Sequence, residues 1–179
     1  MPFSEPAPRW ANIAAHVAAL TPLPSSLWRL SLAFGYPGGY TAEGFTALNL
    51  QGWGITWVVF LSLITEFAAL LTLGLVRPWG RTVPHWIPLI GDTVLNPRII
   101  AATALTGALI LFALWTPFLF WWGIEHPDMT STGHIFVGLA YVPLVAWAPL
   151  LLAVTVNYYQ RERHYSNGRR ATGGMCSAA

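Results

Sequence analysis

The sequence GITWVVFLSLITEFAALLTLGLV occupies residues 54–76 and decides what kind of fold this chain can have. Its one charged side chain is Glu66, and most of the residues on either side are Leu, Val, Ile, Phe and Ala. A helix needs about twenty predominantly apolar residues to cross the hydrocarbon core of a bilayer. This stretch therefore predicts a transmembrane helix that carries a single carboxyl group near its middle.

Three further segments predict spans. Residues 99–122 and 134–158 are predominantly apolar stretches of similar length. Residues 10–35 are long enough to span, but Pro22 and Pro24 interrupt them, and each proline removes a backbone donor and disfavours helix just before it. We therefore expect an all-α integral membrane bundle of four transmembrane helices. The first is broken by the prolines and is either spanning or partly re-entrant.

The remaining segments follow from these spans. We expect residues 1–9 to form an N-terminal cytoplasmic segment and residues 10–159 the transmembrane domain. Residues 160–179 are polar and Gly-rich, which predicts a disordered cytoplasmic tail. The Pro-rich loop at 77–97 predicts an ordered connection at the membrane interface, with its two tryptophans among the headgroups. Because the first ten residues lack the features of a cleavable signal peptide, we expect the chain to be mature from Met1.

Composition supports a membrane protein and excludes several other classes. Hydrophobic residues make up 55% of the chain and charged residues 9%. A soluble domain carries about 25% charged residues, so this chain has too little charge to cover a surface facing water. No basic run is interleaved with exposed aromatic residues, so we expect no nucleic-acid partner. The single cysteine can form no internal disulfide and belongs to no zinc-binding cluster.

The arginines predict the orientation. With four spans, the segments carrying arginine outside the spans all fall on one side of the membrane: Arg9, Arg77, Arg81, Arg98, Arg161, Arg163, Arg169 and Arg170. The connections 36–53 and 123–133 contain no basic residue, but they do contain acidic ones. Because cytoplasmic loops are enriched in Lys and Arg, we expect a multi-pass protein of the cell membrane with both termini in the cytoplasm.

Glu66 is the most informative candidate for chemistry. A carboxyl group at this depth is costly, so it is expected to face the bundle interior. When buried and unpaired, such a group can remain protonated at neutral pH and act as a general acid. Ser62 lies one turn earlier on the same face and is predicted to hydrogen-bond it. The structural alternative is that Glu66 pairs with Arg29 or a helix hydroxyl and only fixes the packing.

The connection GIEHPDMTSTGH at residues 123–134 carries Glu125, His126, Asp128 and His134. Two acids and two imidazoles could relay protons or bind a metal, but their spacing matches no compact metal motif. The structural interpretation is that Asp128 or Ser131 caps the helix that follows. We expect neither a metal nor another cofactor, since no dinucleotide, nucleotide or haem signature is present.

Three longer stretches carry a resemblance: LPSSLWRLSLAFGYPGG at 23–39, LTLGLVRPWGRTVPHWIPLIG at 71–91 and YVPLVAWAPLLLAVTVNYYQRER at 141–163. The chain resembles a family of small bacterial multi-pass membrane proteins that borders the membrane-bound cyclases of indole sesquiterpenoids and related meroterpenoids. The resemblance implies a terpene cyclase of secondary-metabolite and antibiotic biosynthesis. Such an enzyme would fold a prenylated aromatic, such as a farnesyl indole with an epoxidised terminal alkene. It implies acid activation, with no metal and no ionisation of a diphosphate.

The residue roles come from physical chemistry, because the resemblance fixes no signature that maps them. Glu66 would be the general acid, and Asp128 or Glu125 the alternative acids. Aromatic faces stabilise cations, and three side chains in or near the spans are predicted to line the substrate pocket: Trp57, Tyr141 and Trp147. The expected partners are a lipophilic small molecule and the lipid bilayer.

Two other functions remain open on the sequence. The chain could be a non-catalytic assembly partner of other membrane proteins, using small-residue helix faces such as the one at Gly107 and Ala108. It could also be a small proton-coupled transporter in which Glu66 carries the proton. No internal repeat of the kind common in transporters is visible in the sequence.

Overall fold

The computed structural model describes residues 6–77 and 96–176, and this part of the chain is helical, without a strand. The elements in chain order are α1 (Arg9–Leu20), α2 (Leu23–Ala33), α3 (Ala42–Ala47), α4 (Trp53–Leu71), η1 (Thr72–Leu75), α5 (Pro97–Trp115), η3 (Thr116–Gly123) and α6 (Ser131–Cys176). Here η denotes a 3₁₀ helix. The all-α class is therefore confirmed. The predicted interfacial loop with Trp79 and Trp86 lies outside the described residues.

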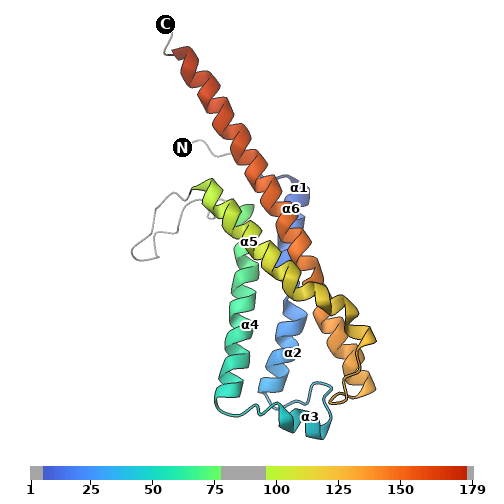
Figure 1. The fold of residues 1–179 in the computed structure, drawn as a ribbon. Helices are drawn as coiled ribbons and strands as arrows, with labels where there is room; N and C mark the ends of the chain where they lie inside the picture. Colours follow the sequence, from blue (N-terminus) through green and yellow to red (C-terminus); the bar gives the residue numbers. More distant parts are fainter. Residues whose placement is uncertain (1–5, 78–95, 177–179) are drawn as a thin grey trace.

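Three helical segments are long and apolar enough to cross a membrane. They are Trp53–Leu75, Pro97–Gly123 and Ser131–Tyr165, with 23, 27 and 35 residues. Each overlaps a span predicted from the sequence. Figure 1 shows α5 crossing obliquely in front of α6, while α4 rises along one side of the bundle. The predicted helical membrane bundle is thus confirmed in part, because three helical segments are long and apolar enough to span a membrane.

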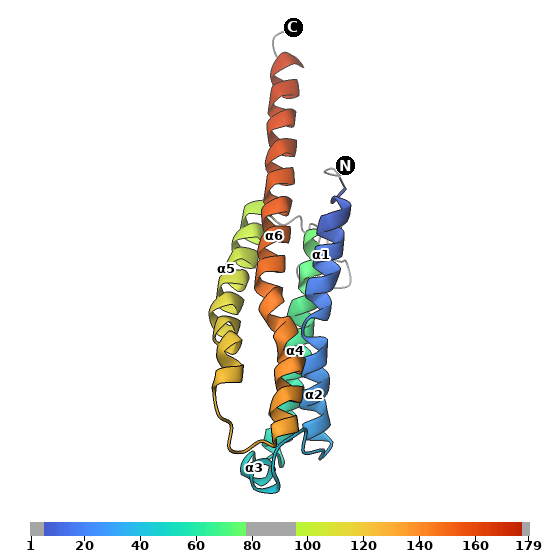
Figure 2. The same cartoon turned by 90° about the vertical axis from the view of Figure 1, so that its right-hand side faces the viewer.

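The first predicted span, residues 10–35, forms two short helices in place of one long helix. α1 has 12 residues and α2 has 11, so neither alone reaches the length of a span. They follow each other along nearly one line beside α4 and α6 (Figures 1 and 2). Pro22 stands at the junction as the N-cap of α2, where its missing N–H breaks no helical bond. The Thr21 hydroxyl donates to the Ala18 carbonyl at 2.7 Å, which satisfies an acceptor at the end of α1.

The end of α6 differs from the disordered tail expected over residues 160–179. The helix continues to Cys176 and extends beyond the rest of the bundle (Figure 1). Polar residues near its exit from the bundle find partners, which favours continued helix. Arg161 donates from Nη2 to the Leu75 carbonyl at 2.9 Å and from Nε to Asn157 Oδ1 at 3.1 Å. The first of these bonds satisfies a carbonyl at the end of η1.

At the opposite end of the bundle, the loop after α2 is joined to the loop before α6. Thr41 N donates to the Asp128 carbonyl at 2.9 Å, and Thr130 N donates to the Gly39 carbonyl at 3.0 Å. Gly39 has a φ of 101°, which glycine adopts without strain. Gly133 packs so closely on it that a Cβ at either glycine would overlap the other's backbone. This end of the molecule therefore depends on two glycines in direct contact.

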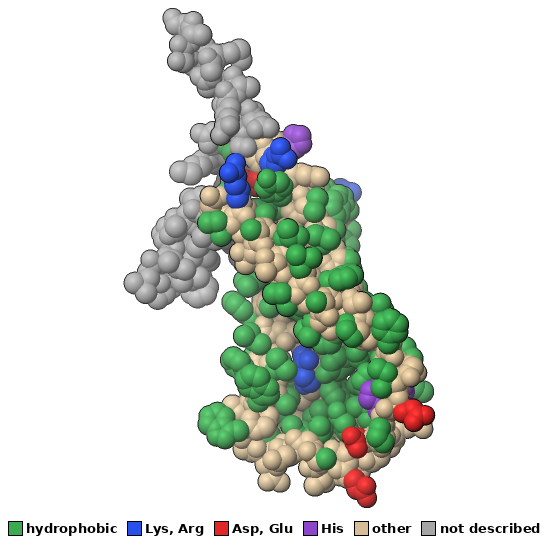
Figure 3. Space-filling view, viewed as in Figure 1, with side chains coloured by type: hydrophobic (Ala, Val, Ile, Leu, Met, Phe, Trp, Pro, Cys, Tyr) green, Lys and Arg blue, Asp and Glu red, His purple; other side chains and the backbone are tan. Residues whose placement is uncertain are grey.

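Charged side chains separate along the length of the bundle. Figure 3 shows most basic side chains near the end where α6 leaves the bundle and acidic side chains near the opposite end. A broad apolar surface lies between them, as expected for the part of a protein that contacts hydrocarbon. One basic side chain is visible within this apolar part, far from the others.

Candidate functional site

Arg29 is a buried charged side chain that contacts the middle of α4. It lies on α2, one turn before the helix ends, and is 8% exposed. Its Nε donates to Ser62 Oγ on α4 at 3.2 Å, and its Nη2 donates to Ser26 Oγ at 3.2 Å. The guanidinium carbon lies 5.9 Å from the centre of the Tyr141 ring, within the range of a cation–π contact. Arg29 therefore joins α2, α4 and α6 through neutral partners.

Glu66 does not pair with Arg29. Ser62 Oγ accepts from Arg29 and donates to the Val58 carbonyl at 2.9 Å, so the predicted bond between Ser62 and Glu66 is also wrong. A serine within an α-helix often donates its hydroxyl to the backbone carbonyl one turn earlier, and Ser62 does so here. Glu66 Oε1 is buried and finds no hydrogen-bond partner in the described part of the chain.

The register of the helices places the two charged groups about one turn apart. α2 and α4 run in opposite directions, and Arg29 meets α4 at Ser62 (Figure 1). Glu66 is four residues farther along α4, about 6 Å by helical rise. Going from Ser62 to Glu66 leads toward the junction between α1 and α2. Glu66 thus lies on the buried side of α4, between Ser62 and the buried Ala69.

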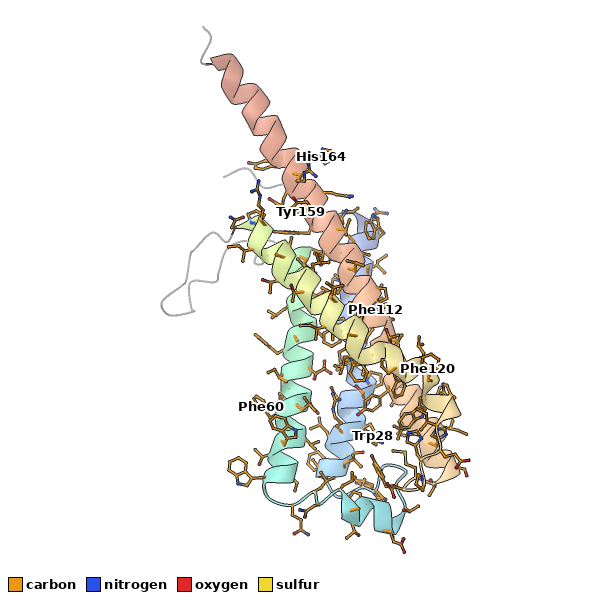
Figure 4. The ribbon with its side chains drawn as sticks, viewed as in Figure 1. Trp28, Phe60, Phe112, Phe120, Tyr159 and His164 are labelled. Carbon is orange, nitrogen blue, oxygen red and sulfur yellow. The ribbon has the colours of Figure 1, made fainter. Side chains whose placement is uncertain are left out.

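Tyr141 is the centre of an aromatic cluster next to Arg29. Its ring makes an edge-to-face contact with Trp28 at 5.5 Å, stacks on Phe118 at 5.5 Å and lies 5.8 Å from Trp115. Trp28, labelled in Figure 4, is held in place because its Nε1 donates to the Gly38 carbonyl at 2.8 Å. The cluster therefore combines side chains of α2, α5, η3 and α6 around one phenol.

The three predicted pocket residues do not come together. Only Tyr141 lies beside Arg29. Trp57 is 64% exposed and contacts Phe60, at 5.9 Å between ring centres, on an exposed part of α4. Trp147 is 3% exposed in the core, and its Nε1 has no hydrogen-bond partner among the described residues. The structure instead adds Trp28, Trp115 and Phe118, whose positions depend on how helices pack and not on any local sequence pattern.

The alternative acids make no hydrogen bond with Arg29, but Asp128 lies near Tyr40, whose ring is 6.0 Å from that of Trp28. Glu125 and Asp128 are exposed in the loop between η3 and α6. The Asp128 carbonyl accepts from Thr41. Neither Asp128 nor Ser131 caps α6, contrary to the expectation from the sequence. The cap is Thr130, whose hydroxyl accepts from Gly133 N at 3.0 Å, because α6 begins directly after it.

A second ring cluster closes the same end of the molecule. The His126 ring lies 3.8 Å from the ring centre of Trp121 and 5.0 Å from that of His134.

Burial raises the pKa of the Tyr40 phenol above its usual value, and Tyr141 and Asp128 raise it further. Tyr40 therefore stays a neutral phenol throughout the physiological pH range. Within the described residues, no group of three or more His, Cys, Asp or Glu side chains could hold a metal ion.

An apolar groove opens on the surface between η3 and α6. Its volume is about 380 Å³. It is lined by Phe118, Leu119, Trp122, Val142, Val145, Ala146 and Pro149. Phe118 also stacks on Tyr141, so one aromatic layer separates the groove from the cluster beside Arg29. The groove has no acidic residue in its wall, and Glu66 does not line it.

The small-residue face considered for assembly is occupied within the chain. Ala108 is buried, and a Cβ at Gly107 would come within van der Waals contact of Leu151 on α6. This face of α5 is therefore used to pack α5 against α6.

Comparison with known proteins found no relative of this chain. No protein-family model matches the chain, and neither a curated protein nor a solved structure matches it. The function of the chain is therefore inferred from the site itself.

Proposed function

We propose that this chain is a membrane-embedded cyclase that converts a prenylated aromatic compound into a polycyclic isomer by acid-initiated carbocation chemistry. The substrate class is a farnesyl-type aromatic such as an epoxidised farnesyl indole, and Glu66 is the general acid. The observation that carries the proposal is the buried Glu66 Oε1, which accepts no hydrogen bond from the described residues. A carboxyl group at this depth without a hydrogen bond is by default a candidate for chemistry.

The chemistry needs few groups from the protein. The Glu66 carboxyl would donate its proton to the epoxide oxygen, and the bond from oxygen to the more substituted carbon would break. The resulting cation would be attacked by neighbouring alkene π electrons, forming carbon–carbon bonds. Loss of a proton from the carbon next to the last cation would create an alkene, and the Glu66 carboxylate could take this proton. The product is an isomer of the substrate, and no redox partner is consumed.

We expect the substrate to extend from Glu66 to the aromatic cluster next to Arg29. The faces of Trp28, Trp115 and Tyr141 can stabilise a passing cation, and their apolar bulk excludes water that would otherwise trap it. A farnesyl chain partitions into the bilayer, because each buried CH₂ contributes about 0.8 kcal/mol. Access from the lipid would therefore bring this substrate to a site that water does not reach.

The proposed topology has four crossings. Together α1 and α2 have 23 helical residues, 12 and 11, and they run beside α4 and α6, so we assign them as the fourth span. This places both chain termini and Arg9, Arg77, Arg98 and Arg161 in the cytoplasm. The loop holding Glu125 and Asp128 would then lie outside.

The topology predicts which thiols an impermeant reagent can reach. Cys176 is the single cysteine of the chain, so it serves as a natural reporter of the C-terminus. In intact cells, an impermeant maleimide should leave Cys176 unlabelled, and opening the membrane should expose it. With Cys176→Ser combined with Glu125→Cys, the new thiol should be labelled in intact cells. Labelling of Cys176 from outside would contradict the assignment.

The proposed activity can be tested in isolated membranes that contain the chain. Addition of an epoxidised farnesyl indole should yield a cyclised product of unchanged mass, which chromatography and mass spectrometry would resolve from the substrate. Membranes prepared without the chain should leave the substrate unchanged. Equal conversion in both preparations, or no conversion in either, would contradict the proposal for this substrate.

A further inference from the structure

Arg29 brings a full positive charge into the apolar interior without a counter-charge at hydrogen-bonding distance. Its partners among the described residues are two serine hydroxyls and the face of the Tyr141 ring. Within residues 6–77 and 96–176, no carboxylate bonds its guanidinium. An unpaired charge in hydrocarbon costs several kcal/mol, far more than two neutral hydrogen bonds return. A residue kept there at this cost indicates a site that a ligand completes.

The geometry points to an anion as that ligand. A guanidinium has five N–H donors in a planar fork, and Ser62 and Ser26 accept from only two of them. The fork matches the two oxygens of a carboxylate or phosphate, and such pairs are the strong form of hydrogen bond. Both serines and Tyr141 hold the fork from different helices, so its direction is fixed before a ligand arrives.

The surroundings decide what kind of anion fits. Trp28, Trp115 and Phe118 surround Tyr141 beside the guanidinium, and they offer no further charge. Arg29 lies four residues before the end of α2, about 6 Å of helical rise from the loop at the acidic end of the bundle. A charged head can reach this depth if it is attached to a chain that remains in hydrocarbon. A free inorganic anion would lose its hydration with nothing to replace it except one residue.

We propose that Arg29, oriented by Ser26, Ser62 and Tyr141, binds the acidic head group of an amphiphile, a carboxylate or phosphate carried on a hydrocarbon chain. The source can be a lipid of the bilayer or a diffusible amphiphile, because both present the same head group. The site stands independently of the cyclase proposal. If both are correct, the bound anion also removes the repulsion between Arg29 and a carbocation near Glu66.

Binding of oleate and of oleyl alcohol to the purified full chain in neutral detergent tests this site, because the two probes differ only in the head group. Oleate should bind at least tenfold more tightly than the alcohol. Arg29→Met should abolish this preference, whereas Arg98→Met, at an exposed arginine near the start of α5, should keep it. Equal binding of the two probes, or an oleate preference that survives Arg29→Met, would overturn the proposal.

Folding of the variant can be separated from loss of the site. Replacing a buried unpaired charge by an apolar side chain of similar length is neutral or stabilising, so Arg29→Met should unfold at the same temperature as the wild type or higher. Arg29→Lys keeps the charge but loses the planar fork, so the oleate preference should be smaller than in the wild type and still measurable. If Arg29→Met unfolds early, loss of the preference in Arg29→Lys would overturn the proposal and its retention would support it.

One further measurement identifies the source, and competition by inorganic phosphate tests whether the hydrocarbon chain is required. Mass spectrometry of the intact protein released from vesicles of phosphatidylglycerol and phosphatidylcholine should show whether phosphatidylglycerol is retained by the wild type and lost in Arg29→Met. Such retention supports a bilayer lipid. Its absence, together with oleate binding that depends on Arg29, supports a diffusible amphiphile. Competition by inorganic phosphate as strong as that by oleate would overturn the assignment to an amphiphile.

Discussion

Glu66→Gln is expected to lower the rate of cyclisation by at least about a hundredfold, because general acid catalysis contributes about 10²–10⁴-fold. The amide is nearly the same size as the carboxyl group but cannot donate the proton that opens the epoxide. The measurement is the initial rate of product formation in membranes that contain equal amounts of each protein. Glu66→Asp keeps the acid on a shorter side chain and should retain part of the activity.

The matched controls for this prediction are Glu125→Gln and Asp128→Asn. Both residues are exposed in the loop between η3 and α6 and do not belong to α4, so the rate should change by less than about twofold. A variant of Glu125 or Asp128 that stops the reaction while Glu66→Gln remains active would move the acid to the loop. That result would contradict the role assigned to Glu66 but leave the cyclase class in place.

Gly133→Ala is expected to cause the largest loss of stability. A Cβ at this position would overlap the backbone of Gly39, which has no side chain to move aside. The two loops would have to separate, which would disturb the bond from Thr130 N to the Gly39 carbonyl. Overpacking of this kind costs about 1–3 kcal/mol. Thermal unfolding in detergent should therefore begin several degrees lower, since about 1 kcal/mol corresponds to about 2–4 °C in a chain of this size.

Gly123→Ala is the control for this substitution. A Cβ at Gly123 would meet no atom within 4 Å, and the residue ends η3 without a positive φ. The same chemical change there should leave the unfolding temperature within about 2 °C of the wild type. Equal effects at Gly133 and Gly123 would show that the contact between the two loops does not stabilise the bundle.

The helical segments could be predicted from the sequence because a span depends on local hydropathy. Residues 54–76 contain one charge in 23 positions, and the observed segment is Trp53–Leu75. The helical end of α6 could not be predicted from residues 160–179 alone. Their Gly and polar residues suggest disorder, whereas Arg161 forms two hydrogen bonds that favour continued helix. The cap of α6 was misplaced by one residue from Ser131, because Ser, Thr and Asp all cap helices and the choice depends on where the helix begins.

The site could be predicted only in part. That Ser62 and Glu66 lie on the buried face of α4 could be predicted, because a charged group facing hydrocarbon is costly. The partner of Arg29 could not be predicted, because it depends on the rotation of α2 against α4. Trp57 was expected in the interior, but the buried face of α4 passes through Ser62 and Ala69, so Trp57 is exposed. The cluster around Tyr141 depends on contacts between distant helices, for which one sequence carries no direct signal.

The most direct test of the central claim uses the purified chain in phosphatidylcholine vesicles, prepared in water enriched in ¹⁸O. The substrate is an epoxidised farnesyl indole, and mass spectrometry follows the products. We expect a cyclised product with the mass of the substrate and no ¹⁸O, because the epoxide oxygen is retained and water does not react. An opened diol containing one ¹⁸O, or no conversion by the purified chain, would contradict it.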